Sequence, residues 1–185
     1  MGLYWTKSPR KFRLSRISDG PTFESLLRTH QGAVRAFLRR ICGDAALADD
    51  LAQDAFLKAY RAMDQLSEEG KLRSWLFGIA YREFLDHARK AKRRRGLSQR
   101  FTPPSPAAVP SGQALDVQRA MDSLAPDCRA VVLLCLLHGL TQAEAAAATG
   151  LPLGTVKSHV TRGKVKLRLV LNAYAPATNS DRSFA

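Results

Sequence analysis

Hydrophobic residues recur every three or four positions along the first half of the chain. This spacing predicts amphipathic helices over residues 23–41, 44–63 and 72–94. Asp44 stands at the start of the second of them, where an N-cap belongs. We expect the second helix to be central, because it is apolar on more than one side.

The second half has the same helical periodicity. It predicts helices over residues 115–124 and 126–137, the latter beginning at Pro126, a residue suited to the first helical position. Neither half contains a strand-like alternation of useful length. The pattern therefore predicts an all-α fold.

Residues 140–169 have the sequence signals of a helix-turn-helix. Thr141 and Glu144 have the spacing of a capping box, and Gly150 supplies a turn after a run of alanines that allows close helix packing. The following helix is predicted to turn Val156 and Val160 inward and to leave a basic face outward. Such a helix fits the DNA major groove.

A proline-rich segment divides the chain. Residues 101–113 contain four prolines and no charge, a composition that favours an extended linker. We therefore predict two small helical domains, at 21–100 and 114–172, between a basic disordered tail at 1–20 and a second disordered tail at 173–185.

The overall charge favours a polyanionic partner. The chain has 29 Lys and Arg against 16 Asp and Glu, a net charge of +13. It has no apolar run long enough for membrane insertion. Cys42, Cys128 and Cys135 lack the spacing of a zinc site or a disulfide framework, so buried thiols are the first interpretation and a redox sensor the second. We expect no metal and no other cofactor.

The helix predicted over 44–63 has an acidic face that DNA would repel. Asp50 and Asp54 are four residues apart and repel each other, which a basic protein partner would relieve. Complementing the helix dipole explains Asp44 but not Asp54, ten residues further along. This face is therefore a candidate protein-docking surface.

The helix predicted over 72–94 combines aromatic residues with a basic end. Bases released from a melted duplex could stack on the rings of Trp75, Phe77 and Tyr81. The basic residues at 89–95 could bind the phosphates along the same strand. Helical spacing also makes Trp75 as good a core residue as a stacking platform.

Three segments resemble one protein family in that family's order. They are DLAQDAFLKAYRAM (50–63), WLFGIAYREFLDHARKAKRRR (75–95) and LTQAEAAAATGLPLGTVKSHVTRGKVKLR (140–168). They resemble the extracytoplasmic-function (ECF) class of sigma-70-type initiation factors of bacterial RNA polymerase. This resemblance implies a sigma2-like helical bundle, a sigma4-like helix-turn-helix and no catalytic chemistry.

The resemblance also implies three sets of contact residues. The minus-thirty-five DNA set is Thr155, Lys157, Ser158, Thr161, Arg162 and Lys164. The minus-ten set, beside the loop at 66–71, is Lys71, Arg73, Ser74, Trp75, Tyr81, Arg82, Arg89 and Arg93. The polymerase-clamp set is Asp50, Gln53, Asp54 and Phe56.

The implied partners are promoter DNA, core RNA polymerase through its clamp helices and flap, and an anti-sigma factor. No small-molecule substrate is implied. We expect a cytoplasmic bacterial protein that an anti-sigma factor could hold at the membrane.

Four residues depart from the family pattern. Arg82 stands where many relatives have Asn, and Gly78 where Arg is common. His159 and Thr161 replace a frequent Arg and a larger residue in the recognition helix. The DNA preference of relatives therefore does not transfer.

Two other functions fit parts of the sequence. An autonomous helix-turn-helix regulator would bind duplex DNA without polymerase, usually as a dimer, but leaves the acidic face without a purpose. A metal-dependent nuclease would need a metal site built from carboxylates on separate helices; its candidate residues are Asp49, Asp50, Asp54, Asp86 and His87.

Overall fold

The computed structural model describes residues 23–63, 71–95 and 112–172, and every regular element in these ranges is a helix. The first half contains α1 (Phe23–Cys42), α2 (Ala45–Ala62) and α3 (Leu72–Arg95). The second half contains α4 (Gln113–Asp122), α5 (Pro126–Val132), the π-helical turn η3 (Leu133–Leu137), α6 (Gln142–Thr149) and α7 (Leu153–Asn172). The all-α prediction is confirmed.

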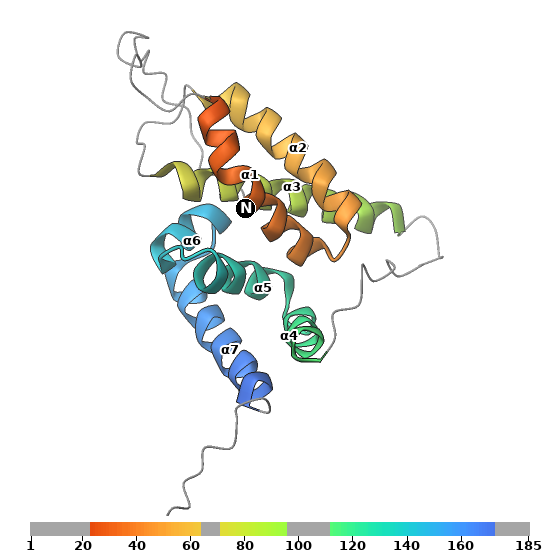
Figure 1. Cartoon of the computed structure of the whole chain (residues 1–185), viewed down its shortest axis with the longest axis vertical. Coiled ribbons are helices and arrows are strands. Elements are labelled where there is room, and N and C mark those ends of the chain that lie inside the picture. The colour runs from red at the N-terminus through yellow and green to blue at the C-terminus, as the bar shows by residue number, and fades with distance from the viewer. Residues whose placement is uncertain (1–22, 64–70, 96–111, 173–185) are drawn as a thin grey trace, which may run out of the picture.

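The two halves lie against each other. Figure 1 shows α1, α2 and α3 grouped together, with α6 and α5 beside them and α7 leading away from the junction. The predicted tails, at 1–20 and 173–185, and all but the last two residues of the predicted linker lie outside the described residues. The domain boundaries at 21–100 and 114–172 remain predictions.

Local sequence signals set the ends of several helices. The Asp44 carboxylate accepts a hydrogen bond from the Leu47 amide at 3.1 Å, which confirms it as the N-cap of α2. Thr141 and Glu144 form the predicted capping box at the start of α6. Gly150 ends α6 with a φ of 73°, a left-handed conformation that glycine adopts without strain.

The helix predicted over residues 126–137 changes character after Val132. Its last five residues widen into η3, which the His138 amide closes by donating to the Leu133 carbonyl at 3.0 Å. Leu133 and Leu134 remain buried there, while Leu136 and Leu137 are exposed. The spacing of apolar residues did not predict this widening. It indicates which side of a helix is buried, but it does not distinguish an α-helical turn from a π-helical one.

The described residues of both halves share one continuous apolar core rather than the two separate cores expected from the sequence. The junction is tight because Gly78 in α3 lies against the backbone of Ala148 in α6. His138 fills the space beside it, with its ring 4.9 Å from that of Phe77 and 6.1 Å from that of Phe37. The two halves are thus joined by the small residues Gly78 and Ala148 and by the imidazole ring of His138.

Within the second half, α7 packs on α5 through a glycine that the sequence analysis did not single out. Gly163 is buried, and a Cβ there would lie 2.1 Å from Cγ2 of Val132. Val132 is itself 1% exposed and β-branched, so it has no room to turn away. Gly163 therefore fixes the distance between the two helices.

We predict that Gly163→Ala lowers the free energy of unfolding by about 1–2 kcal/mol, because overpacking outweighs the helix propensity gained. Gly32→Ala is the matched control, since nothing lies within 4 Å of a Cβ there. The control should stabilise slightly. Urea unfolding followed by circular dichroism measures both, and equal effects of the two substitutions would contradict the prediction.

Candidate nucleic-acid interface and protein-docking surfaces

Helix α7 presents the basic face that the sequence predicts. Val156 and Val160 are buried at 0% and 4% exposure and anchor the helix to the second half. The predicted DNA-contacting residues lie on the other side, where all except half-buried Thr155 are exposed: Lys157, Ser158, Thr161, Arg162 and Lys164. The structure thus brings this set together on one helix face.

Two hydroxyl groups on this face already have partners within α7. Ser158 Oγ donates to the Gly154 carbonyl at 3.0 Å, and Thr161 Oγ1 donates to the Lys157 carbonyl at 3.1 Å. Their lone pairs remain available to accept hydrogen bonds from base amino groups. The cationic side chains are the stronger candidates for reading guanine.

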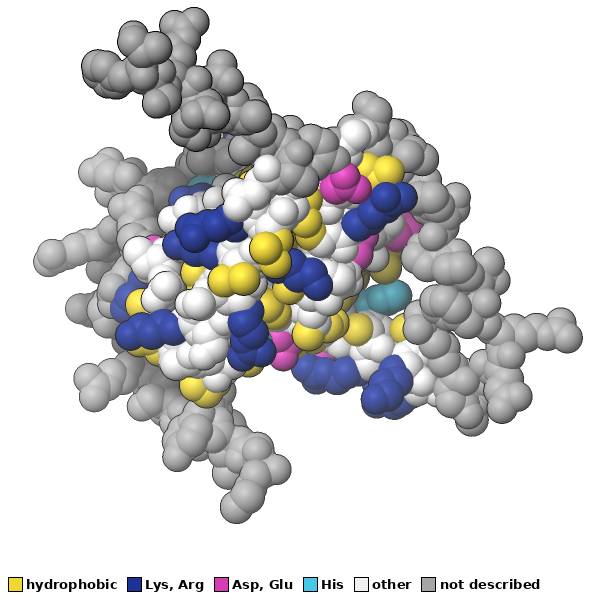
Figure 2. Space-filling model, turned by 90° about the horizontal axis from the view of Figure 1, so that it is seen from below, with side chains coloured by type: hydrophobic (Ala, Val, Ile, Leu, Met, Phe, Trp, Pro, Cys, Tyr) yellow, Lys and Arg dark blue, Asp and Glu magenta, His cyan; other side chains and the backbone are white. Residues whose placement is uncertain are grey.

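Figure 2 views the molecule from the side on which α7 lies and shows Lys and Arg side chains spread over this face with hydrophobic ones between them. Few acidic side chains interrupt them in this view. Among the apolar side chains of α7, Val165 and Leu169 are 56% and 70% exposed. This combination of positive charge and apolar surface suits a DNA backbone and also a protein partner.

His159 is only half-buried and faces the packed side of α7. Its carbonyl accepts the Cys128 thiol at 3.6 Å, and its Nδ1 atom is buried without a hydrogen-bond partner among the described residues. This position therefore joins α7 to α5 and is not centred on the reading face.

The acidic face of α2 is open, with one exception among its predicted residues. Asp50, Gln53 and Asp54 are exposed together, whereas Phe56 is 7% exposed and belongs to the core. Asp49 is directed toward α1, where it pairs with Arg39 at 3.0 Å. Three side chains, and not Phe56, therefore make up the available polar surface.

Two large exposed residues of α2 extend this surface and were missed in the sequence analysis. Leu57 is 53% exposed and Tyr60 is 62% exposed, with the Tyr60 ring edge-on to Phe23 at 5.0 Å. Leu57 follows Gln53 and Asp54 by four and three residues, so it shares their face. This spacing could have identified Leu57 from the sequence. It was overlooked because the helix has apolar residues on more than one side.

The residues predicted to contact the minus-ten strand divide between surface and interior. Five cationic side chains are exposed: Lys71, Arg73, Arg82, Arg89 and Arg93. The other three predicted residues are covered: Ser74 at 5% exposure, Tyr81 at 1%, and half-buried Trp75. Trp75 packs against the core, as its helical spacing allowed. Only Lys71 of the predicted loop at 66–71 lies within the described residues.

The Tyr81 hydroxyl donates a hydrogen bond of 2.6 Å to Oδ1 of Asp127 in α5. Burial and this hydrogen bond both raise the pKa of Tyr81, so the phenol stays protonated at neutral pH. The Tyr81 ring, which the sequence analysis expected to accept a base, is therefore buried in this structure, with its hydroxyl bonded to the second half of the chain.

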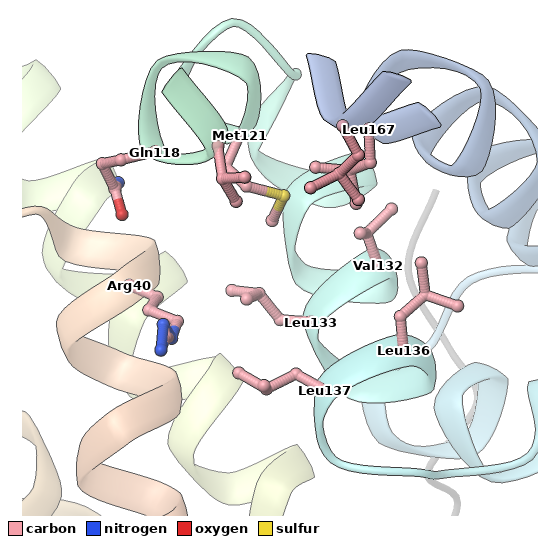
Figure 3. A pocket seen from close by; sticks show the side chains of 10 residues that line it. Arg40, Gln118, Met121, Val132, Leu133, Leu136, Leu137 and Leu167 are labelled. Atoms are coloured by element: carbon pink, nitrogen blue, oxygen red, sulfur yellow. The ribbon is translucent and has the colours of Figure 1, made fainter. Parts of the chain in front are cut away.

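An open apolar pocket of about 560 Å³ lies between α1, α4, η3 and α7 (Figure 3). One cation lies at its edge, Arg40 of α1. Its other lining residues are Val117, Gln118, Met121, Val132, Leu133, Leu136, Leu137, Leu167 and Leu171. A hollow of this size that exposes leucines favours a protein partner with apolar side chains.

The cysteines are protonated in this fold. Burial raises the pKa of Cys42 to about 12 and raises the pKa of both Cys128 and Cys135 above the ordinary value. Cys128 is buried and Cys42 and Cys135 are half-buried, so thiols that act as small apolar side chains fit better than reactive ones. No metal-binding group of His, Cys, Asp and Glu occurs within the described ranges. None of the helices in that part of the chain has the length and apolar character that a membrane span needs.

Comparison with known families gives two matches. Residues 26–94 match the model of Sigma-70 region 2, and residues 114–167 match that of Sigma-70, region 4. The first range covers most of the helical residues of the first half, and the second covers most of those of the second half.

Individual proteins are similar over most of the chain. The ECF RNA polymerase sigma factor SigE of Mycolicibacterium smegmatis is 34% identical over 85% of this chain, which spans 65% of the length of SigE. The RNA polymerase sigma factor CarQ of Myxococcus xanthus is 32% identical over 85% of this chain and 95% of CarQ. The sigma factor RpoE of Bartonella quintana, solved with the anti-sigma factor NepR, is similar at a TM-score of 0.71 and 31% identity, covering 81% of this chain and 96% of RpoE.

We predict that His138 makes the fold sensitive to mild acid. Burial and the neighbouring Arg73 and Arg40 lower the pKa of His138 from 6.5 to about 4, so the unfolded chain takes up the proton first. The stability that depends on neutral His138 is present above pH 6.5 and is lost as the pH falls toward 4. The loss should be about 2 kcal/mol between pH 7 and pH 5.

Urea unfolding of the wild type and of His138→Leu at both pH values measures this effect. The substitution should remove that part of the pH dependence, whatever it does to stability at pH 7. An unchanged difference between pH 7 and pH 5 in His138→Leu would contradict the assignment.

Proposed function

Because the chain belongs to the ECF class of RNA polymerase sigma factors in the sigma-70 family, we propose that it holds promoter DNA at two points while α2 docks on core polymerase. The first half would capture the minus-ten element, and the second half would read the minus-thirty-five element. The bond-forming chemistry would belong entirely to polymerase.

The single observation that carries the proposal is the separation of opposite charges onto different helices. The exposed acids of α2 and the exposed bases of α7 lie on separate elements. Phosphates attract α7 and repel α2, so one chain offers DNA and a basic protein surface different docking sites. An autonomous DNA-binding regulator needs only the first of these.

On the DNA side, we propose that Lys157 and Arg162 reach base edges from the first turns of α7, with Lys164 on the phosphates. The major groove accepts a helix in this orientation, and Arg or Lys bonds guanine there. On the polymerase side, we propose Asp50, Gln53 and Asp54 as the polar contacts, with Leu57 as an apolar neighbour. Phe56 would support this surface from the core.

We further propose that the apolar pocket between α1, α4, η3 and α7 receives a helix of an anti-sigma factor. Support comes from its exposed leucines and from two solved relatives. Besides RpoE with NepR, CnrH was solved with the cytosolic domain of CnrY and is similar at a TM-score of 0.59 and 26% identity, covering 82% of this chain and 88% of CnrH. An inhibitor seated there would contact both halves, since Arg40 belongs to the first and Leu137 to the second.

The proposed function is tested by transcription in vitro with core polymerase across a genomic promoter library. The chain should direct transcripts from a limited set of promoters, and core alone should not. No sequence-specific transcript at any promoter would overturn the proposal. Tight binding to a two-fold operator without polymerase would favour the autonomous regulator instead.

We predict that Asp54→Lys weakens the binding of core polymerase by about tenfold, because it puts a like charge against a basic surface. Asp86→Lys is the matched control, an acid of α3 that pairs with Arg89 at 3.3 Å and lies outside the proposed contact. Biolayer interferometry with immobilised chain measures both. Equal losses in the two variants would indicate general electrostatics and not a docking surface.

We predict that Arg162→Ala lowers the affinity for a recovered promoter duplex by about 10- to 100-fold and relaxes base preference at one position. Lys164→Ala should weaken the binding of DNA duplexes of all sequences to the same extent, and it should reduce the slope of log affinity against log salt by about one. Arg28→Ala is the control, a cation of α1 paired with Glu24 at 2.6 Å. Fluorescence anisotropy at several salt concentrations distinguishes these outcomes.

A further inference from the structure

Thr161 lies at the centre of the exposed face of α7. At 3.6 residues per turn, Lys157 and Lys164 lie to one side of it. Ser158 and Arg162 lie to the other side, and all five side chains are exposed. A base edge between those that Lys157 and Arg162 are proposed to contact therefore meets Thr161.

The hydroxyl hydrogen of Thr161 is already used within the helix. Its Oγ1 atom donates to the Lys157 carbonyl at 3.1 Å. Because a hydroxyl group has one hydrogen, Thr161 has none left for the acceptors of guanine or for O4 of thymine. What it retains for DNA is an Oγ1 lone pair and its methyl group.

The same hydrogen bond holds the methyl group in place. Threonine is β-branched, and in a helix few χ1 rotamers are open to it. Fixing Oγ1 on the Lys157 carbonyl therefore also fixes Cγ2 of Thr161. Little rotamer entropy is then lost when a partner covers this methyl group.

The residues one and two turns before Thr161 let DNA come close to it. Gly154 lies on the same face, and in the described part of the chain nothing lies within 4 Å of a Cβ there. Packing therefore does not require glycine at this position, but its missing side chain leaves the face shallow. Ser158 adds a single hydroxyl group, which donates back to the Gly154 carbonyl at 3.0 Å. A side chain as short as that of Thr161 can thus reach a base edge.

A methyl group has one counterpart in the major groove. Among the four bases, thymine alone carries a methyl group there, at C5. Packing the threonine methyl against it removes both from water, which favours thymine over a base that lacks the methyl. The cations on either side cannot make this distinction, because their donors select acceptor atoms such as O6 and N7 of guanine.

We propose that Thr161 is a specificity-determining residue that reads a thymine in the major groove through its methyl group. The inference rests on the proposed function, because it names a base that the DNA-reading face of α7 selects. The duplex element that α7 reads then combines a guanine, bound by a cationic side chain, with a thymine recognised by apolar contact.

The test begins with duplexes that the full chain selects from a random-sequence pool. Each thymine of the selected element is replaced in turn by uracil, which keeps the base pair and O4 but lacks the C5 methyl group. Fluorescence anisotropy measures the affinity of each duplex. At one position, uracil should weaken the binding of the wild type by about fourfold, the factor expected for burying one methyl group.

Two substitutions at the same position separate the methyl group from the hydroxyl group. Thr161→Ser keeps the hydroxyl and lacks the methyl, so thymine and uracil should bind this variant equally. Thr161→Val keeps a methyl and lacks the hydroxyl, so the loss caused by uracil should persist, whatever the overall affinity. Ser158→Ala is the matched control, and it should keep the same loss. Circular dichroism checks that all three variants fold.

The outcomes separate the inference from the proposed function. A uracil effect that persists in Thr161→Ser, or that is lost in Thr161→Val, overturns methyl recognition; the second result would make Oγ1 the reading atom. Selection that enriches no sequence, or an element without a methyl-sensitive thymine, also overturns it, even if the wild type transcribes normally with core polymerase. Absence of promoter-specific transcripts overturns the proposed function, whatever the uracil comparison shows.

Discussion

The close approach of α3 and α6 at Gly78 and Ala148 is the constraint on which the rest of the structure depends. Because no side chain separates the two backbones, the cores of the two halves merge, and His138 is buried beside Phe37 and Phe77. The same approach brings Asp127 within hydrogen-bonding distance of Tyr81. Small residues here do more than relieve crowding, since they determine which surfaces of α3 meet solvent.

Much of the fold could be predicted from sequence, because its signals are local. The Asp44 cap, the Thr141 and Glu144 capping box and the left-handed Gly150 each depend on residues within one helical turn. The outward basic face of α7 follows from 3.6-residue periodicity, which also leaves Val156 and Val160 as its buried anchors. Such features require no knowledge of distant parts of the chain.

What the sequence could not predict depends on contacts between distant residues. The proline-rich segment predicted two separate domains, but in the structure α3 packs closely on α6. This contact joins Gly78 and Ala148, which are 70 positions apart in the sequence. Tyr81 and Trp75 satisfied two patterns at once, a helical core stripe and an aromatic platform, and only the tertiary contacts distinguish the two roles. Phe56 illustrates the same limit, because a motif position carries no information on which way the side chain faces.

A substitution within a helix that is proposed to contact DNA can therefore act through packing as well as through recognition. An arginine at position 78 would offer a charge to a phosphate, but its Cβ would lie 3.0 Å from the Ala148 carbonyl oxygen, so the Ala148 backbone would have to shift by a few tenths of an ångström. Glycine lacks that charge and permits the contact without such a shift, so one position affects both the charge of α3 and its packing on α6. Net positive charge does not compensate for this, since attraction to phosphate cannot expose a ring held inside the protein. In this arrangement the predicted cationic residues of α3 are open to solvent, whereas the ring of Tyr81 is not.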